Sequence, residues 1–342
     1  MKYLSLFSGI GGFELGIQQA YENNKSGQSV SEWTRSREHI RPDGNQSDNQ
    51  VQRPKTEQEE HLPQDNPICV GFSEIDKYAI ATYQQHYPTH HNYGDITKIN
   101  ADELPDFDLL VGGFPCQAFS IAGKRKGFED TRGTLFFEIA RILKAKQPRL
   151  FLLENVKGLL SHDNGQTFRT IIATLDELGY DLQWQVLNSK NHGVPQNRER
   201  IFIVGHLRGT SRPEVFPFRE AIGATNEGLD TRNTEVASTL RSRYGNGTGS
   251  HIQQLNQPKH SNDRVYGVGG VSPTLNTMQG GNRQPFVYEE GKVGIRRLTP
   301  TECERLQGFP DGWTIGSDTQ RYKQCGNAVT VNVIRDIMIR LL

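Results

Sequence analysis

Short apolar runs that alternate with helical stretches constrain the fold of the first 205 residues more than any other feature. The runs have the length and composition of strands, and they cover residues 3–7, 68–72, 109–112, 150–153, 184–187 and 201–204. Helical stretches lie between some of them, over residues 13–21, 78–86 and 134–146. Because strands that alternate with helices form mostly parallel sheets, we expect an α/β fold with a doubly wound, Rossmann-like sheet.

Three regions depart from this alternation. Residues 23–67 are rich in Gln, Asn, Ser, Glu and Arg and cannot bury enough apolar surface to offset their ordering entropy, which predicts a disordered insertion. Residues 206–293 are rich in Gly, Asn, Thr and Arg without a helical period, which predicts a second, smaller, loop-rich domain. Residues 294–342 end in an apolar stripe at helical spacing, and we expect this C-terminal helix to pack back on residues 1–205.

Composition narrows the class of protein. No apolar run approaches the roughly 20 residues that span a bilayer, and the N-terminus lacks the apolar core of a signal peptide, so we expect a cytoplasmic protein. The four cysteines, Cys69, Cys116, Cys303 and Cys325, lie far apart without a C-x-x-C pair, and we expect no metal site. The formal net charge is zero, which counts against a nucleic-acid partner but does not exclude a basic face.

One cysteine has a distinctive setting. Cys116 follows the apolar run 109–112, and Gly113 and Pro115 restrict the backbone before it. A buried structural cysteine in a turn is the simpler interpretation. Open α/β sheets bind ligands at the carboxyl ends of their strands, however, and a thiol held at such an end is a common arrangement for a nucleophile.

Charged residues stand at the ends of two further strands. Glu154 follows the run 150–153, where it is either a helix cap, a surface ion pair, or an acid with a raised pKa that faces the same edge as Cys116. Arg198 and Arg200 lead into the run 201–204 and share one face of a strand. Their guanidinium groups suit phosphates or base edges, unless they only pair with Glu199 between them.

A glycine turn follows the first strand. Gly9, Gly11 and Gly12 do not complete the G-x-G-x-x-G spacing of dinucleotide sites, because position 14 holds no glycine. Glu74 nevertheless favours a nucleotide site at this turn, since an acidic residue that closes the second strand can accept hydrogen bonds from both ribose hydroxyls of an adenosine. Asp95 is a candidate for holding the adenine amino group.

These motifs, in this order, resemble the family of cytosine-C5 DNA methyltransferases, including those of Type II restriction–modification systems. The resemblance is carried by Pro115-Cys116-Gln117, Glu154-Asn155-Val156, the Gln-x-Arg-x-Arg run at 196–200, and the closing segments 297–310 and 324–329. It covers nearly the whole chain outside the insertion and the variable region. It implies a DNA (cytosine-5-)-methyltransferase that moves a methyl group from S-adenosylmethionine to C5 of a flipped cytosine in a specific duplex sequence.

The resemblance also implies roles for individual residues. Cys116 attacks C6 of the base, and Glu154 binds N3 and the exocyclic amine. Arg200 supplies positive potential near the base, and Arg198 a supporting phosphate contact. The residues implied to bind the cofactor are Phe7, Gly9, Gly11, Gly12, Glu74, Ile75, Asp95, Ile96, Phe114, Leu135, Asn327 and Val329. The residues implied to contact DNA are Gln117, Ser120, Lys124, Arg264, Thr274 and Leu275.

The same resemblance assigns the domains and partners. Residues 1–205 form the catalytic domain that binds S-adenosylmethionine, residues 206–293 a target-recognition domain, and residues 294–342 a return segment that completes the catalytic domain. We expect a monomer of bacterial or phage origin that acts on double-stranded DNA. A cognate restriction endonuclease would act on the same site without needing to bind this chain.

Three alternatives stay open at this point. A tRNA cytosine-C5 methyltransferase would share Cys116, Glu154 and the glycine turn, although the sizeable variable region favours DNA. A dinucleotide oxidoreductase is disfavoured by the glycine spacing. A catalytically inactive DNA-binding regulator is disfavoured by the complete set of Cys116, Glu154 and Arg200.

Overall fold

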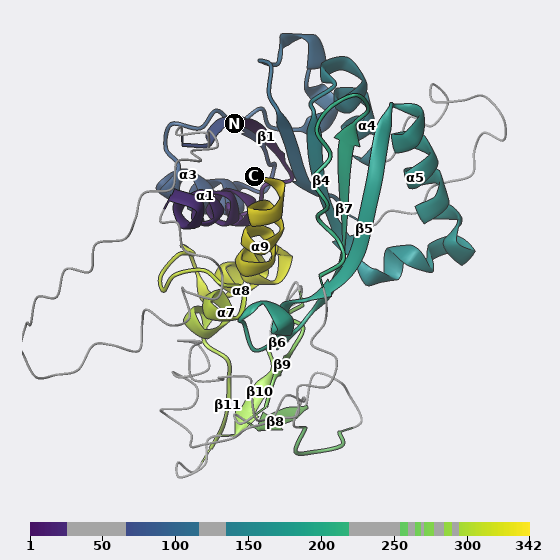
Figure 1. Ribbon diagram of the computed structural model, residues 1–342. Helices are drawn as coiled ribbons and strands as arrows, with labels where there is room; N and C mark the ends of the chain where they lie inside the picture. Colours follow the sequence, from purple (N-terminus) through teal and green to yellow (C-terminus); the bar gives the residue numbers. More distant parts are fainter. Residues whose placement is uncertain are drawn as a thin grey trace, which may run out of the picture.

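A six-stranded sheet forms the centre of the protein (Figure 1). The computed structural model describes residues 1–25, 66–115, 135–218, 254–258, 264–267, 270–276, 284–288 and 294–342. The strand order is β2-β1-β3-β4-β7-β5. The strands are β1 (Lys2–Leu6), β2 (Ile68–Ser73), β3 (Leu109–Gly113), β4 (Leu150–Val156), β5 (Tyr180–Asn188) and β7 (Glu199–Leu207).

The sheet is mostly parallel, as the alternation of strands and helices predicts. β1 pairs in parallel with β2 and β3, and β3 with β4. β7 runs antiparallel to both of its neighbours, β4 and β5. Every strand expected from the apolar runs is present, so the predicted α/β, doubly wound fold is confirmed.

Helices cover both faces of the sheet (Figure 1). α1 (Gly12–Lys25) and α9 (Val331–Leu341) pack on one face, where alternate strand residues such as Leu150 and Leu152 point. α4 (Leu135–Lys146) and α5 (Gln166–Glu177) pack on the other face, against Phe151 and Leu153. This segregation follows from the period of two along a strand.

The C-terminal helix packs back on the first helix, as expected from its apolar stripe. A Cβ atom at Gly16 of α1 would lie 2.7 Å from Ile334 of α9, so the close approach of these helices depends on the missing side chain. The shorter elements are α3 (Lys77–His86), α7 (Pro300–Leu306), α8 (Asp318–Asn327), η2 (Ile96–Lys98), η3 (Ala101–Glu103), η5 (Lys157–Leu160), η6 (His162–Gly165) and η7 (Ser189–His192).

A smaller region extends from the carboxyl edge of the large sheet (Figure 1). It contains the strand order β11-β10-β8, made of β8 (Val265–Gly267), β10 (Phe286–Tyr288) and β11 (Ile295–Arg297). A separate pair joins β6 (Gln196–Asn197) to β9 (Ser272–Pro273). The small sheet therefore includes β11, which lies beyond residue 293, the predicted end of the recognition domain.

The start of that region also differs from the expectation. Residues 213–218 belong to the core, because Val215 and Phe216 are buried against the sheet. Gln183 and Gln185 of β5 hold this segment through hydrogen bonds to its backbone. A boundary at 205 cuts through this packed segment, since the change in composition there does not coincide with the end of core packing.

The expected insertion lies mostly outside the described residues. At its start, α1 continues to Lys25 rather than ending near residue 21. Lys25 Nζ donates to Asn66 Oδ1 at 2.6 Å, so the two ends of segment 26–65 are neighbours. Within the described part of the chain, no helix has both the length and the apolar character needed to cross a bilayer.

Glu14 is a fully buried acid on α1. Its Oε1 accepts from the Tyr83 hydroxyl at 3.1 Å, and that hydroxyl also meets His90 Nδ1 at 3.0 Å. Burial raises the pKa of Glu14 to about 7, although hydrogen bonds from Ser5 and Tyr83 act in the opposite direction. The protonated carboxyl is therefore favoured in the folded chain more than in the unfolded chain.

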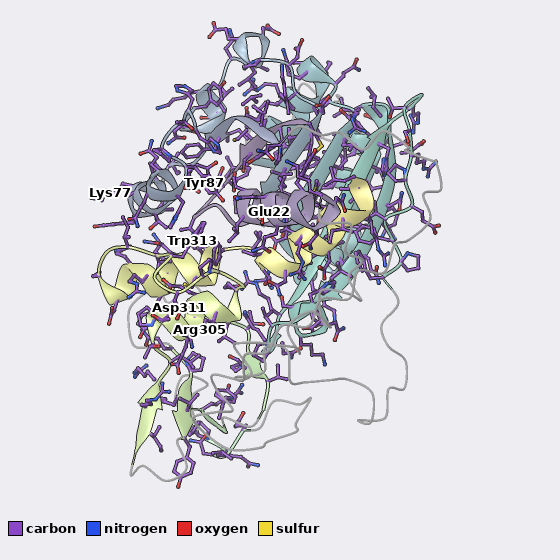
Figure 2. All side chains as sticks on the ribbon, turned by 60° about the vertical axis from the view of Figure 1, so that its left-hand side comes forward. Glu22, Lys77, Tyr87, Arg305, Asp311 and Trp313 are labelled. Carbon is purple, nitrogen blue, oxygen red and sulfur yellow. The ribbon has the colours of Figure 1, made fainter. Side chains whose placement is uncertain are left out.

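The first prediction concerns stability against pH. Because the pKa of Glu14 is higher in the folded chain, this group stabilises the fold at low pH, and that stabilisation is lost as the pH rises through 7. Between pH 5 and pH 8, the free energy of unfolding of the wild type should fall by about 2 to 3 kcal/mol relative to that of Glu14→Gln. Urea unfolding of both proteins across this range measures the difference. Glu22→Gln, on the exposed side of the same helix (Figure 2), is the matched control and should follow the wild type. Parallel pH profiles for wild type and Glu14→Gln would contradict the prediction.

Candidate active site

The carboxyl ends of β1, β3 and β4 meet at one edge of the sheet, and the antiparallel strand β7 begins at that same edge. Gly113 of β3 is the register partner of Glu154 in β4. Val156, two residues later in β4, is the partner of Arg200 in β7. Strand pairing therefore brings three of the motifs identified in the sequence to one place.

Glu154 and Arg200 form a buried ion pair at this edge. Arg200 Nε lies 3.0 Å from Glu154 Oε1, and the two side chains are only 17% and 11% exposed. A Cβ atom at Gly113 would lie 3.2 Å from Glu154 Oε2, so the glycine leaves room for the carboxyl group. Burial raises the pKa of Glu154 above its usual value, while the guanidinium groups of Arg200 and Arg198 lower it. The site thus favours a carboxyl that can hold a proton next to a fixed positive charge.

Cys116, Gln117, Ser120 and Lys124 lie outside the described residues, and the structure describes the chain up to Pro115. Asn155 Nδ2 donates to the carbonyl oxygen of Phe114 at 2.9 Å. The Phe114 ring is buried and packs on Phe136, with ring centroids 5.6 Å apart. Asn155 therefore fixes the end of β3 next to Glu154, just before the chain reaches Cys116. The sequence contains this residue in the Glu-Asn-Val motif, but no pattern in the sequence predicts its partner.

The three described cysteines are poor candidates for a nucleophile. Burial raises the pKa of Cys69 to about 12, and it raises the pKa of Cys303 and Cys325 as well. Cys303 and Cys325 are completely buried in the core. A thiolate is disfavoured at each of these positions, which leaves Cys116 as the reactive candidate.

Arg198 has a different place from the one expected. Its side chain is 3% exposed, and its guanidinium group donates to the carbonyl oxygens of Leu275, Gly326 and Ala328 at 2.9 to 3.4 Å. The expected phosphate contact does not fit this arrangement, because the donors are turned inward. Arg198 instead joins β7 to two segments that are distant in the sequence.

Leu275 and Thr274 are also bound to the catalytic region. Leu275 is 1% exposed in an apolar cluster, and its N–H donates to the side chain of Gln196 at 3.0 Å. Burial does not fit the expected contact of Leu275 with DNA. Thr274 is exposed, but its hydroxyl donates to the carbonyl oxygen of Asn197 at 2.6 Å. The segment is thus attached along the strand that leads to Arg200, while Arg264 is exposed at the start of β8.

The glycine turn after β1 has the left-handed conformation that glycine favours. Gly9 has a φ of 56° and Gly11 a φ of 89°. A Cβ atom at Gly11 would lie 2.9 Å from the Tyr87 ring, whereas one at Gly9 would meet no atom within 4 Å. Phe7 has a φ of 54° at the start of this turn. The turn is closed on its Tyr87 side and open at Gly9, as a site for a ligand requires.

Glu74 is fixed against this turn. Its Oε2 accepts from the N–H of Gly9 at 2.9 Å, and its Oε1 accepts from the N–H groups of Ile75 and Asp76 at 2.8 Å. Ile75 is 73% exposed beside it. An acidic side chain and an exposed apolar side chain therefore border the open turn.

The other residues expected near the cofactor are divided between this border and the core. Val329 lies between the turn and the catalytic strands, 2.8 Å from a Cβ atom placed at Gly12 and 3.6 Å from one at Gly113. Asn327 is exposed at the end of α8. Asp95 caps η2 by accepting from Thr97. Ile96 is packed in the core, and Leu135 is half-buried against it.

The C-terminal segment packs against this glycine turn through Trp313. Trp313 Nε1 donates to the carbonyl oxygen of Ile10 at 2.8 Å. The Trp313 ring stacks on His86, with ring centroids 3.6 Å apart. Its edge faces the ring of Tyr87, with centroids 6.2 Å apart, and Figure 2 labels both of these residues. Residues from opposite ends of the chain therefore shape the turn together. The described residues hold no group of three or more side chains suited to a metal ion.

Comparison with known proteins decides the family. The model of the C-5 cytosine-specific DNA methylase family matches residues 61–342. The chain belongs to this family. It is a DNA (cytosine-5-)-methyltransferase, and it contains the Pro-Cys-Gln and Glu-Asn-Val motifs on which the resemblance rests.

Two relatives and one solved structure illustrate the match. The chain is 36% identical to the Type II methyltransferase M.NlaX of Neisseria lactamica, over 98% of this chain and 94% of that one. It is 42% identical to the Type II methyltransferase M1.ScrFI of Lactococcus lactis subsp. cremoris, over 80% and 72%. The fold is similar to that of the S. pombe Dnmt2 methyltransferase, with a TM-score of 0.65 at 19% identity over 100% and 98% of the two chains.

The second prediction concerns Arg198. Arg198→Met should cost about 3 kcal/mol in the free energy of unfolding, because it leaves buried carbonyl groups without donors. Arg208→Met is the matched control, since Arg208 forms exposed ion pairs with Asp176 and Asp181, and it should cost less than about 1 kcal/mol. Urea unfolding measures both. Equal costs for the two variants would contradict the role of Arg198 as a buried connector.

Proposed function

We propose that this chain methylates C5 of a flipped cytosine in a specific duplex DNA sequence, with Cys116 as the nucleophile and S-adenosylmethionine as the methyl donor. The observation that carries the proposal is the buried Glu154–Arg200 ion pair beside the strand end that leads to Cys116. Flipping is required because the reacting edge of the base is enclosed in a duplex.

The described residues fit S-adenosylmethionine. Glu74 would accept hydrogen bonds from the ribose hydroxyls, and Ile75 would pack on the adenine. The open turn at Gly9 would receive the amino-acid part, since a side chain there would meet no atom. S-adenosylmethionine, when bound, supplies a methyl group on a positively charged sulfur.

Cys116 and Glu154 would activate the base together. Cytosine C5 is a poor nucleophile, so the Cys116 thiolate forms a bond to C6 and the electron pair of the C5–C6 double bond becomes available at C5. Glu154, in its carboxyl form, donates its proton towards N3 and accepts a hydrogen bond from the exocyclic amine. The raised pKa of Glu154 supports this role, because a carboxylate has no proton to donate. After C5 gains the methyl group, N3 returns its proton to Glu154 and the C5 proton passes to water. The electrons of the C5–H bond re-form the C5–C6 double bond as Cys116 leaves C6 as a thiolate.

Arg200 would orient Glu154 and add positive potential near the base. Its Nε holds one carboxyl oxygen at 3.0 Å, which leaves the other free to face a ligand. An ordinary cysteine has a pKa of about 8.5, so a nearby guanidinium group would also favour the Cys116 thiolate. Arg198 would act through position, by fixing the strand that carries Arg200.

Duplex DNA is the substrate we favour over tRNA. The Type II methyltransferase M.NlaX aligns with 98% of the chain, and the region between 219 and 293 has the size of a recognition unit. Equal amounts of duplex DNA and tRNA, incubated with the enzyme and tritiated donor, separate the two substrates. Label in tRNA alone would overturn the preference.

The third prediction tests the two catalytic residues. Cys116→Ala should abolish transfer of the tritiated methyl group to DNA, because the base is no longer activated. Glu154→Gln keeps the shape of the side chain but removes the proton donor, and it should lower kcat roughly 10²- to 10⁴-fold. Cys69→Ala is the matched control and should retain activity, since Cys69 lies near the amino end of β2, opposite to the edge that carries Glu154 and Arg200. Full methylation by Cys116→Ala would refute the mechanism.

The fourth prediction tests the cofactor border without relying on activity. Glu74→Gln should weaken binding of S-adenosylhomocysteine by about tenfold, since a neutral amide is a poorer acceptor for two hydroxyl groups. Isothermal titration calorimetry measures the dissociation constant directly. Asp102→Asn, at an exposed acid on η3, should bind like the wild type. An unchanged dissociation constant for Glu74→Gln would remove Glu74 from the cofactor site.

A further inference from the structure

An exposed ion pair lies at the ends of the two strands that carry Glu154 and Arg200. Lys157 Nζ lies 3.0 and 2.9 Å from the two carboxylate oxygens of Glu199. The side chains are 53% and 45% exposed, in contrast to the buried pair beside them. Neither residue has a role in the mechanism derived above.

Strand pairing places this pair next to the catalytic residues. Lys157 follows the last residue of β4, and Glu199 is the first residue of β7. Val156 and Arg200 are register partners between the two strands, so the exposed pair lies one residue further towards solvent on each strand. A duplex that delivers a base to Glu154 would bring phosphates close to these strand ends.

The charges of the pair have opposite consequences for a nucleic acid. A bare Glu199 carboxylate would repel a phosphate at this position, and a free Lys157 ammonium would attract it. Exposed ion pairs contribute little to stability, so Lys157 can exchange one oxygen partner for another at small cost. An ammonium group is also a compact donor that binds phosphate without a fixed geometry.

We propose that Lys157 contacts a DNA phosphate close to the flipped cytosine, and that Glu199 competes for Lys157 in the free protein. Binding of DNA transfers the Lys157 ammonium from a carboxylate to a phosphate. Glu199 thereby weakens association with any duplex that does not seat a phosphate at these strand ends. The inference rests on the proposed action on DNA and adds a contact that selects a correctly seated duplex.

The backbone contacts make Glu199 suitable for substitution. Arg200 Nη1 donates to the carbonyl oxygen of Glu199 at 2.8 Å, and this contact does not involve the Glu199 side chain. Glu199→Gln therefore removes the competing charge and leaves the catalytic strand intact. Lys157→Met removes the ammonium group and keeps an unbranched side chain of similar length.

The experiment measures the dissociation constant of a methylatable duplex by fluorescence anisotropy, from 50 to 200 mM salt. Lys157→Met should bind roughly fivefold to tenfold more weakly near 0.1 M salt, and the slope of log affinity against log salt should fall by about one. Glu199→Gln should bind roughly twofold to fivefold more tightly. In the Lys157→Met background, Glu199→Gln should give no such gain, because no ammonium remains to be released.

Charge-matched variants at the opposite edge of the sheet control for the change in net charge. Asp106→Asn and Lys144→Met alter exposed residues near the amino end of β3 and the end of α4, and they should leave the affinity and the salt slope unchanged. Unfolding in urea confirms that each variant is folded.

Two results would overturn the inference. An unchanged salt slope in Lys157→Met would show that Lys157 touches no phosphate. An equal gain in DNA affinity from Glu199→Gln with and without Lys157 would show that Glu199 only repels DNA and does not compete for Lys157. Wild-type protein that neither binds nor methylates the duplex would instead refute the proposed function, so the two failures are distinguishable.

Discussion

The candidate site depends on one buried ion pair at the carboxyl edge of the sheet. Glu154 and Arg200 are held 3.0 Å apart by the antiparallel pairing of β4 and β7, and their burial makes each charge sensitive to the other. Desolvation favours a protonated carboxyl, whereas the guanidinium group favours a carboxylate. This balance suits a group that must donate a proton to a base and then recover it, and it would be lost if either partner were exposed to water.

The pair stays in place because distant parts of the chain converge behind it. Arg198 binds carbonyl groups of the segments around Leu275 and Gly326, which border the small sheet and the cofactor turn respectively. The Gln196 side chain accepts a hydrogen bond from the N–H of Leu275 and donates one to the carbonyl oxygen of Leu306. Burying a guanidinium group is costly unless its donors are paired. Both terminal nitrogens of Arg198 are paired in this way, whereas its buried Nε has no hydrogen-bond partner among the described residues. The segments around Leu275, Leu306 and Gly326 are thus tied to the strand that carries Arg200 by a single set of hydrogen bonds.

Sequence patterns predicted the sheet, because apolar periodicity is a local feature of the sequence, and they placed the candidate residues at strand ends. They also predicted that Glu154 and Arg200 share one edge. They could not predict the burial of Arg198 or Leu275. The two residues contact each other across more than seventy residues of sequence, and Arg198 also contacts the still more distant Ala328. A pair of arginines before a strand gives no sign of which one turns inward. The role of Asn155 was missed for the same reason, as its partner is a backbone carbonyl and not a patterned side chain.

The most direct test of the central claim is to trap the bond between the protein and the base. A duplex that carries 5-fluorocytosine at the target position cannot lose its C5 substituent as a proton, so the Cys116–C6 bond should persist after methyl transfer. Denaturing electrophoresis followed by peptide mass spectrometry should then show one protein–DNA adduct at Cys116, formed by the wild type and absent from Cys116→Ala. An enzyme that methylates normal duplex but forms no adduct, or forms it at another cysteine, would contradict the account.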